Sequence, residues 1–135
     1  MTGKRILVVD DEESVRWALT KAFERAGYRV DLATDGPSGF VAAANPEVDL
    51  VLLDVRLPGR DGLGVLRDLR KRRPDLPVIM MTAYGTLQVA VEAMKHGAYD
   101  YIGKPFDMDE VLLVVEKALE AQALTREVST ATSTR

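Results

Sequence analysis

Five short runs rich in apolar residues alternate along this chain with longer amphipathic stretches. The runs have the length of buried strands, and the stretches between them repeat apolar residues at helical spacing. Strict alternation of strand and helix predicts a doubly wound α/β fold, in which a parallel sheet with right-handed crossovers carries helices on both faces. The predicted strands are 5–9, 29–33, 50–53, 78–81 and 99–102.

The second of these strands alternates polar and apolar residues, as expected at the edge of a sheet. Capping residues set the starts of three helices: Asp61 precedes the third, Thr86 the fourth and Asp107 the fifth. The first three helices are predicted at 13–26, 37–44 and 62–72.

The length of 135 residues argues for one domain. We place this domain at residues 1–124 and predict that the small polar residues of 125–135 form a disordered tail or linker. The chain contains no cysteine, which excludes disulfides, thiolate metal sites and a cysteine nucleophile. No apolar run approaches the ~20 residues of a membrane span. We therefore expect no membrane partner and a cytoplasmic location.

The net charge of −3 argues against a direct nucleic-acid surface. One local exception is the basic cluster formed by Arg67 and residues 70–73. Because it falls at the end of a predicted helix, where cations complement the helix dipole, we interpret it as a solvated helix end.

Charged and hydroxyl side chains stand where the predicted strands run into loops. Asp10 and Asp11 follow the first strand, and Asp54, Thr82 and Lys104 follow the third, fourth and fifth. Open α/β sheets bind ligands beyond the carboxyl ends of their strands. The sequence therefore predicts three carboxylates, one ammonium and one hydroxyl at a single edge.

Oxygen-rich clusters of this kind suit Mg²⁺, which takes one or two carboxylates together with waters and phosphate oxygens. Asp10, Asp11 and Asp54 supply the carboxylates, a backbone carbonyl just after Asp54 adds a further ligand, and Lys104 adds a second cation for a phosphate. A carboxylate can itself be a nucleophile that forms an aspartyl-phosphate, and Asp54 is the best candidate. Asp10 and Asp11 could instead only cap the following helix, but the expected co-location of all these groups favours the functional interpretation.

The motifs around these residues are similar to those of the response-regulator receiver domain. They are VVDDE at 8–12, LDVRLPGRDG at 53–62, MTAY at 81–84 and KPF at 104–106. The resemblance covers about residues 5–124 and implies a flavodoxin-like strand order of 2-1-3-4-5. The segments SVRWAL at 14–19 and GAYDYI at 97–102 look most like the receivers of nitrogen-regulation-type, sigma-54-dependent transcription activators.

This resemblance implies a role for each site residue. Asp54 would be the phosphoacceptor, and Mg²⁺ would bind Asp10, Asp11, Asp54 and the backbone carbonyl of Arg56. The phosphoryl group would bind Thr82, Ala83 and Lys104, and a switch would pair Thr82 with Tyr101. The peptide bond between Lys104 and Pro105 would be cis.

The resemblance also implies partners. These are a sensor histidine kinase as phosphodonor and an output domain, with an ATPase core and a DNA-binding part, in a longer chain. A homodimer through the last helix is also predicted, because Ala121, Leu124 and Val128 have the spacing of a short coiled-coil seam.

Two alternatives remain beside the signalling function. One is a phosphohydrolase of the aspartyl-phosphate type, although Arg56 stands where such an enzyme needs an acidic general acid. The other is a docking module that ignores phosphate, against which the intact acidic cluster argues.

Overall fold

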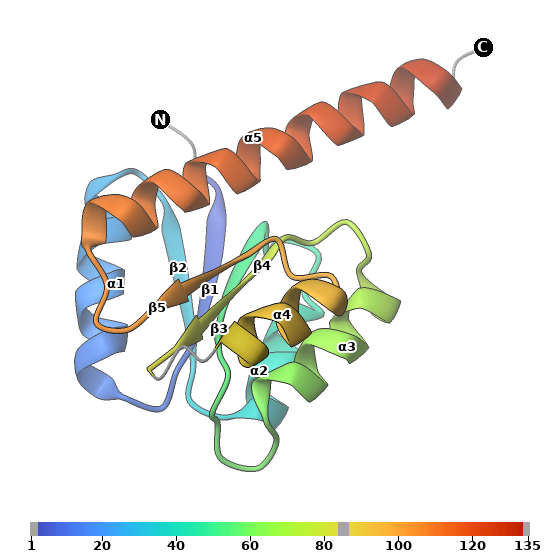
Figure 1. The fold of residues 1–135 in the computed structure, drawn as a ribbon. Helices are drawn as coiled ribbons and strands as arrows, with labels where there is room; N and C mark the ends of the chain where they lie inside the picture. The colour runs from blue at the N-terminus through green and yellow to red at the C-terminus, as the bar shows by residue number, and fades with distance from the viewer. Residues whose placement is uncertain (1–2, 84–86, 134–135) are drawn as a thin grey trace.

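The chain folds as a five-stranded parallel sheet with helices on both faces (Figure 1). The computed structural model describes the backbone of residues 3–83 and 87–133, and their side chains except those of 87 and 125–133. The strand order β2-β1-β3-β4-β5 confirms the predicted doubly wound fold. The strands are β1 (Arg5–Val9), β2 (Arg29–Ala33), β3 (Leu50–Asp54), β4 (Val78–Thr82) and β5 (Asp100–Gly103).

Successive side chains of the central strands enter opposite layers, because the side-chain period of a strand is two. In β1, Leu7 and Val9 pack against one group of helices, whereas Ile6 and Val8 pack against the other. None of the four is exposed to solvent, so both faces of the sheet are covered, as the continuous apolar runs predicted. The helices of the first layer are α2 (Gly36–Ala43), α3 (Gly62–Arg72) and α4 (Leu87–Lys95), and those of the second are α1 (Glu13–Arg25) and α5 (Met108–Ser133).

Helix α3 begins as predicted, because the side chain of Asp61 accepts a hydrogen bond from the amide of Gly64 at 2.8 Å. Helix α2 begins one residue earlier than predicted, at Gly36, and the carboxylate of Asp35 caps it. The predicted cap of α4, Thr86, lies outside the described residues.

Helix α5 continues well past the predicted end of the domain and projects beyond the sheet (Figure 1). We predicted a disordered polar tail from residue 125, although the predicted coiled-coil seam required a helix as far as Val128. The backbone is helical through Ser133. The physical reason is that no glycine or proline follows Pro105, so nothing in the sequence interrupts the helix. The domain boundary at residue 124 stays a prediction.

Among the helices in the described part of the chain, none combines the length and the apolar character that crossing a bilayer requires.

Candidate functional site

The carboxyl ends of the central strands bring the predicted site residues to one edge of the sheet. Val9 in β1 pairs with Leu53 in β3, and Asp54 pairs with Met81 in β4, so Asp10, Asp54 and Thr82 follow one another across the edge. Asp54 and Thr82 are the last residues of β3 and β4, so each of these strands ends one residue later than predicted.

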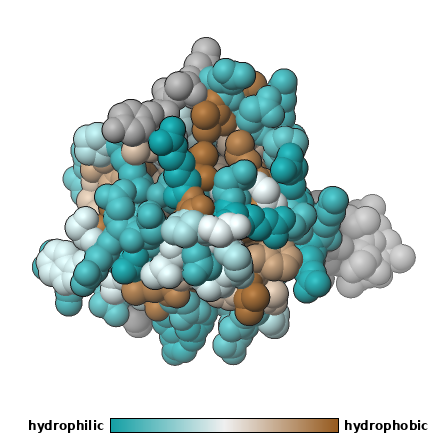
Figure 2. Space-filling model, turned by 90° about the horizontal axis from the view of Figure 1, so that it is seen from below, coloured by the Kyte–Doolittle hydropathy of each residue, from teal (hydrophilic) through white to brown (hydrophobic). Residues whose placement is uncertain are grey.

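The residues Asp10, Asp54 and Thr82 are buried, with 0%, 6% and 6% of their surface exposed. Figure 2 shows the molecule from the end at which the strands finish, where a narrow hydrophobic strip runs between largely hydrophilic residues. Two carboxylates that lie below such a surface need a counter-ion, since burying an unpaired charge is costly.

The ammonium of Lys104 is that counter-ion. Its Nζ donates to Asp10 Oδ2 at 2.6 Å, to Asp54 Oδ2 at 3.1 Å and to Glu12 Oε1 at 3.2 Å. The Lys104 side chain is 9% exposed, and its backbone amide donates to the carbonyl of Thr82 at 2.7 Å. The peptide bond that follows, to Pro105, is cis, the isomer that we expected.

Backbone amides hold the two buried carboxylates from the other side. The amide of Glu12 donates to Asp10 Oδ1 at 2.8 Å, and the amide of Arg56 donates to Asp54 Oδ1 at 3.1 Å. Both carboxylates are therefore oriented by the loops that leave β1 and β3, with their second oxygens turned toward Lys104.

These contacts shift the pKa of the ammonium and of one carboxyl. Burial lowers the pKa of Lys104, but its hydrogen bonds to Asp10 and Asp54 more than offset this, so the net shift is upward. Burial raises the pKa of the Asp54 carboxyl, and the hydrogen bonds from Lys104 and Arg56 lower it by less. One ammonium shared between two carboxylates cannot compensate both of them fully.

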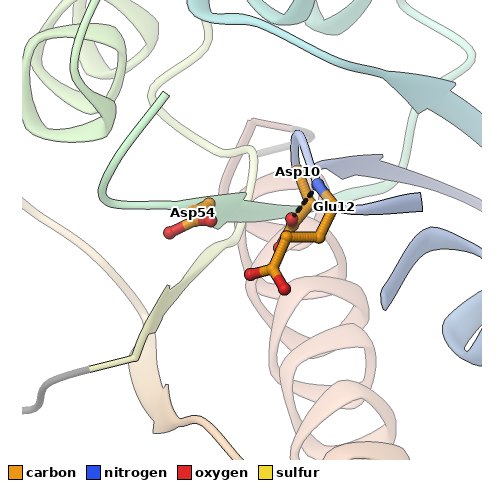
Figure 3. Close-up of side chains that lie close together, drawn as sticks. All are labelled: Asp10, Glu12 and Asp54. Carbon is orange, nitrogen blue, oxygen red and sulfur yellow. Dashed lines mark hydrogen bonds between the residues drawn. The ribbon is translucent and has the colours of Figure 1, made fainter. Parts of the chain in front are cut away.

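The carboxylates of Asp10, Glu12 and Asp54 form the group that could hold a metal ion, with one oxygen of each within 4.8 Å of the others (Figure 3). Oxygen donors of this type suit Mg²⁺, and the Lys104 ammonium at the same oxygens shows that the cluster accepts a cation. Asp11, the predicted third carboxylate, is exposed and is not one of the three.

Glu12 is the residue that the sequence reasoning missed, although it stands in the VVDDE motif. It is the N-cap of α1, with extended backbone angles (φ −88°, ψ 119°), and its side chain is 56% exposed. Four consecutive acidic residues after a strand, at 10–13, were a signal for it, but which of them turns toward Lys104 depends on the backbone of this turn.

The loop after Asp54 is held against the strand by a close backbone approach at Gly62. The amide of Gly62 donates to the carbonyl of Val55 at 2.8 Å, and a Cβ on Gly62 would lie 2.1 Å from the carbonyl oxygen of Asp54. Glycine is therefore required where α3 starts beside the site. Arg56 lies within this loop, and its carbonyl as a metal ligand stays a prediction.

The predicted switch residues lie on two neighbouring strands. Thr82 is buried and Ala83 beside it is exposed, while Tyr101 is 41% exposed on β5. Tyr101 lines a cavity of about 420 Å³ with Val91 and Met94 of α4. The coupling of Thr82 to Tyr101 stays a prediction, and the loop at 84–86 through which we expected it to act lies outside the described residues.

A cavity of about 530 Å³ opens directly beside the carboxylates. Glu12 and Lys104 line it on the side of the site, and the rest of the wall is mostly apolar. The remaining residues of the wall are Ser14, Val15, Ala18, Ala83, Pro105 and Phe106. The cavity therefore connects solvent with Glu12 and Lys104 at the edge of the site.

Residues 6–116 match the family described as Response regulator receiver domain. The chain belongs to this family. This receiver domain is 43% identical over 124 residues to Regulatory protein AtoC of Escherichia coli K12, and 44% identical over 114 residues to the DNA-binding transcriptional regulator NtrC of Salmonella typhimurium. The two alignments cover 92% and 84% of this chain but 27% and 24% of those relatives, so the chain spans about a quarter of their length.

Solved structures agree with the match. The receiver domain protein (CheY-like) from Methanospirillum hungatei superposes with a TM-score of 0.87 at 31% identity, over 92% of this chain and 99% of that one. NtrX from Brucella abortus in complex with ADP superposes with a TM-score of 0.89 at 41% identity, over 95% of this chain and 30% of that one. The receiver domain therefore has the fold and the nitrogen-regulation-type relatives that its motifs indicated.

Proposed function

We propose that this receiver domain accepts a phosphoryl group on Asp54 from a phosphohistidine of a sensor histidine kinase. One observation carries the proposal: Asp54 and Asp10 both contact the ammonium of Lys104. Asp54 stands at the end of the fully buried strand β3. A nucleophilic carboxylate needs a neighbouring cation because the transferred group brings about −2 charges of its own.

In the transfer, one carboxylate oxygen of Asp54 forms the new O–P bond as the N–P bond of the phosphohistidine breaks. The electron pair of that bond stays on the imidazole nitrogen. Lys104 already touches Asp54 Oδ2 at 3.1 Å, so its ammonium can bind an oxygen of the arriving phosphoryl group with little movement. The domain would catalyse this uptake and its own slow dephosphorylation.

We propose that Mg²⁺ binds at the same edge, held by Asp10, Asp54, the Arg56 carbonyl and an acidic residue of the following turn, Asp11 or Glu12. Bound Mg²⁺ would neutralise charge that develops on the transferring phosphoryl group. The chain's own contribution is orientation: the amides of Glu12 and Arg56 fix one oxygen of each buried carboxylate and leave the other free for a cation.

Access from solvent supports a protein phosphodonor. The 530 Å³ cavity reaches Lys104 along a wall formed by Val15, Ala18 and Phe106. An apolar groove that ends at a polar site suits a partner helix that presents one reactive side chain. A phosphohydrolase acting on small substrates is less well supported, since Arg56 stands at the position where that class needs a general acid.

After transfer, we propose that Thr82 and the amide of Ala83 bind the phosphoryl group and that Tyr101 changes its exposure in response. The half-exposed Tyr101 beside α4 is in a position to do so, because its cavity leaves it room. A ligand shifts such a two-state element only if it binds one state better, and a hydrogen bond from Thr82 to the phosphoryl group provides that difference.

We further propose that the receiver works within a longer cytoplasmic chain that carries an output domain with an ATPase core and a DNA-binding part, and that α5 contributes to a homodimer. The greater length of the relatives supports this, and so does the fact that one of them, NtrC, is a DNA-binding transcriptional regulator. The extension of α5 past the sheet supports it also.

Incubation with acetyl phosphate and Mg²⁺, followed by intact mass, tests the proposal. We expect one added phosphoryl group on the native protein, and none on Asp54→Asn or after chelation of Mg²⁺. Asp75→Asn is the matched control, because Asp75 is an exposed aspartate that precedes β4, at the opposite edge of the sheet. Full labelling of Asp54→Asn would refute the assignment, labelling of neither protein would favour a docking module, and rapid consumption of acetyl phosphate without a labelled protein would favour a phosphohydrolase.

A further inference from the structure

Two helices end at one cavity of about 520 Å³ whose lining is almost entirely basic. Arg67, Arg70 and Lys71 of α3 form one side, and Lys95 of α4 with His96 and Gly97 forms the other. No acidic residue belongs to this lining. The volume is in the range of small-molecule sites.

The cavity lies at the far edge of the sheet from Asp54. Helix α3 begins at Gly62, directly beside the backbone of Asp54, and its 11 residues end just before the start of β4. A helix of this length spans about 16 Å. The basic cavity is therefore separate from the phosphoacceptor site.

Helix ends alone do not account for this much positive charge. Two helix C-termini carry about one negative elementary charge between them. Glu92 adds another, at 3.9 Å from Lys95 Nζ and 3.6 Å from His96 Nε2. The carboxylate of Asp75 also interacts with Arg70. About a quarter of the charge of Arg67, Arg70, Lys71 and Lys95 is left uncompensated, in a chain whose net charge is −3.

The wall of the cavity is partly rigid. The guanidinium of Arg70 donates to the carbonyl oxygens of Arg73, Pro74 and Leu76, and its side chain packs under Gly97, which has a φ of 93°. A Cβ at Gly97 would lie 2.7 Å from Arg70 Cδ. Arg67, Lys71 and Lys95 are exposed around this fixed base and are able to reach a ligand.

The neighbouring basic residues do not extend the cavity into a stripe. Arg72 lies over the ring of Phe40 at 5.5 Å, and Arg73 donates to the carbonyl oxygens of Ala43 and Asn45 at 3.0 Å. Both are turned toward α2, so the basic lining of the cavity does not continue onto Arg72 and Arg73. A nucleic-acid backbone needs an extended basic surface, whereas a concave site of this volume fits a compact anion.

We propose that this cavity between the ends of α3 and α4 binds a small, multiply charged phosphate compound. Arg and Lys are the side chains that recognise phosphate oxygens, Arg by paired hydrogen bonds and Lys as a point charge. Lys95 also lines the cavity of Tyr101 on the other side of α4. A bound anion would thus contact a residue that also borders Tyr101, whose exposure we propose to change on phosphorylation.

Titration with inorganic pyrophosphate tests this site, in buffer freed of divalent cations and followed by calorimetry and amide chemical shifts. Removing Lys71 and Lys95 together, as K71Q/K95Q, is expected to weaken binding about tenfold, since each exposed ion pair with phosphate contributes a modest share. The matched control K21Q/K117Q makes the same charge change on α1 and α5 and should bind pyrophosphate within about twofold of the native protein.

The amides of His96 and Gly97 should shift on titration. Asp54→Asn should bind pyrophosphate as the native protein does, so that the result does not depend on phosphoacceptor function. Equal losses in the two double variants would overturn the proposal. So would shifts confined to the Asp54 edge, or the absence of binding by the native protein at millimolar pyrophosphate.

Discussion

Replacing Lys104 by methionine should destabilise the receiver domain more than the loss of any exposed lysine. Methionine keeps an unbranched stem of similar shape but removes the ammonium that contacts Asp10, Glu12 and Asp54. Asp10 and Asp54 would stay buried without a counter-ion, 0% and 6% exposed. Glu12 would simply return to solvent.

The expected loss is about 3 kcal/mol of unfolding free energy at neutral pH without Mg²⁺, at the low end of the ~3–5 kcal/mol that breaking a buried ion pair costs. At an effective dielectric constant of about 20, each ammonium–carboxylate contact near 3 Å is worth roughly 5–6 kcal/mol before desolvation. The low end applies because the backbone amides of Glu12 and Arg56 still donate to Asp10 and Asp54 after Lys104 is replaced. Such a loss is a large part of a typical domain stability of about 5–15 kcal/mol.

Urea unfolding followed by far-UV circular dichroism measures this loss. Fluorescence of Trp17 is a poor probe, because its side chain is already 64% exposed in the folded state. Lys117→Met, at an exposed position of α5, is the matched control and should change stability by less than about 0.5 kcal/mol. Mg²⁺ should stabilise Lys104→Met more than the native protein, since a cation that binds only the folded state takes over the missing charge.

Combining Lys104→Met with Asp54→Asn should recover most of the loss, because the pair is then removed on both sides. A loss below about 1 kcal/mol for Lys104→Met, the value of a surface ion pair, would refute this account of the site. The same loss in the Asp54→Asn background would refute it also.

Three further predictions follow from the same geometry. Asp54→Asn should be more stable than the native protein at neutral pH, because folding raises the pKa of the Asp54 carboxyl. This advantage should shrink as the pH falls toward 3.8, the pKa of this carboxyl in the unfolded chain, and urea unfolding across that pH range checks it. Gly62→Ala should lower the free energy of unfolding by about 2 kcal/mol or more and impair phosphoryl uptake. Gly103→Ala, whose Cβ would meet no atom within 4 Å, should change neither urea unfolding nor phosphoryl uptake appreciably. Calorimetry with Mg²⁺ should separate Asp11 from Glu12: if the family pattern holds, Asp11→Asn weakens binding more than Glu12→Gln, and the reverse order would assign the ligand to Glu12.

The fold could be predicted because its strands are buried on both faces. Three continuous apolar runs, those of β1, β3 and β4, leave a parallel sheet between helices as the arrangement that covers them, and the alternating run of β2 belongs at an edge. The co-location of Asp10, Asp54, Thr82 and Lys104 followed from the same topology, since the carboxyl ends of parallel strands meet at one edge.

Side-chain direction beyond the strand ends could not be predicted in this way. Asp11 and Glu12 are adjacent acidic residues, and only the backbone angles at the start of α1 turn Glu12 toward Lys104. Likewise, the basic residues of α3 were recognised as a helix end. That Lys95 at the end of α4 and His96 after it face them depends on how α3 and α4 pack, which periodicity does not encode. For residues 125–133, polar composition indicated disorder while the absence of glycine and proline permitted the helix that is present.

The position of Lys104 links the stability of the domain to its proposed chemistry. Its shortest contact, 2.6 Å, is to Asp10 rather than to Asp54, so the ammonium is held mainly by the carboxylate that is not expected to be phosphorylated. A phosphoryl group on Asp54 would add charge next to this ammonium and draw it away from Asp10, which would then need another cation. Mg²⁺ at Asp10 would supply that cation. Metal binding and phosphorylation should therefore each raise the affinity of the domain for the other.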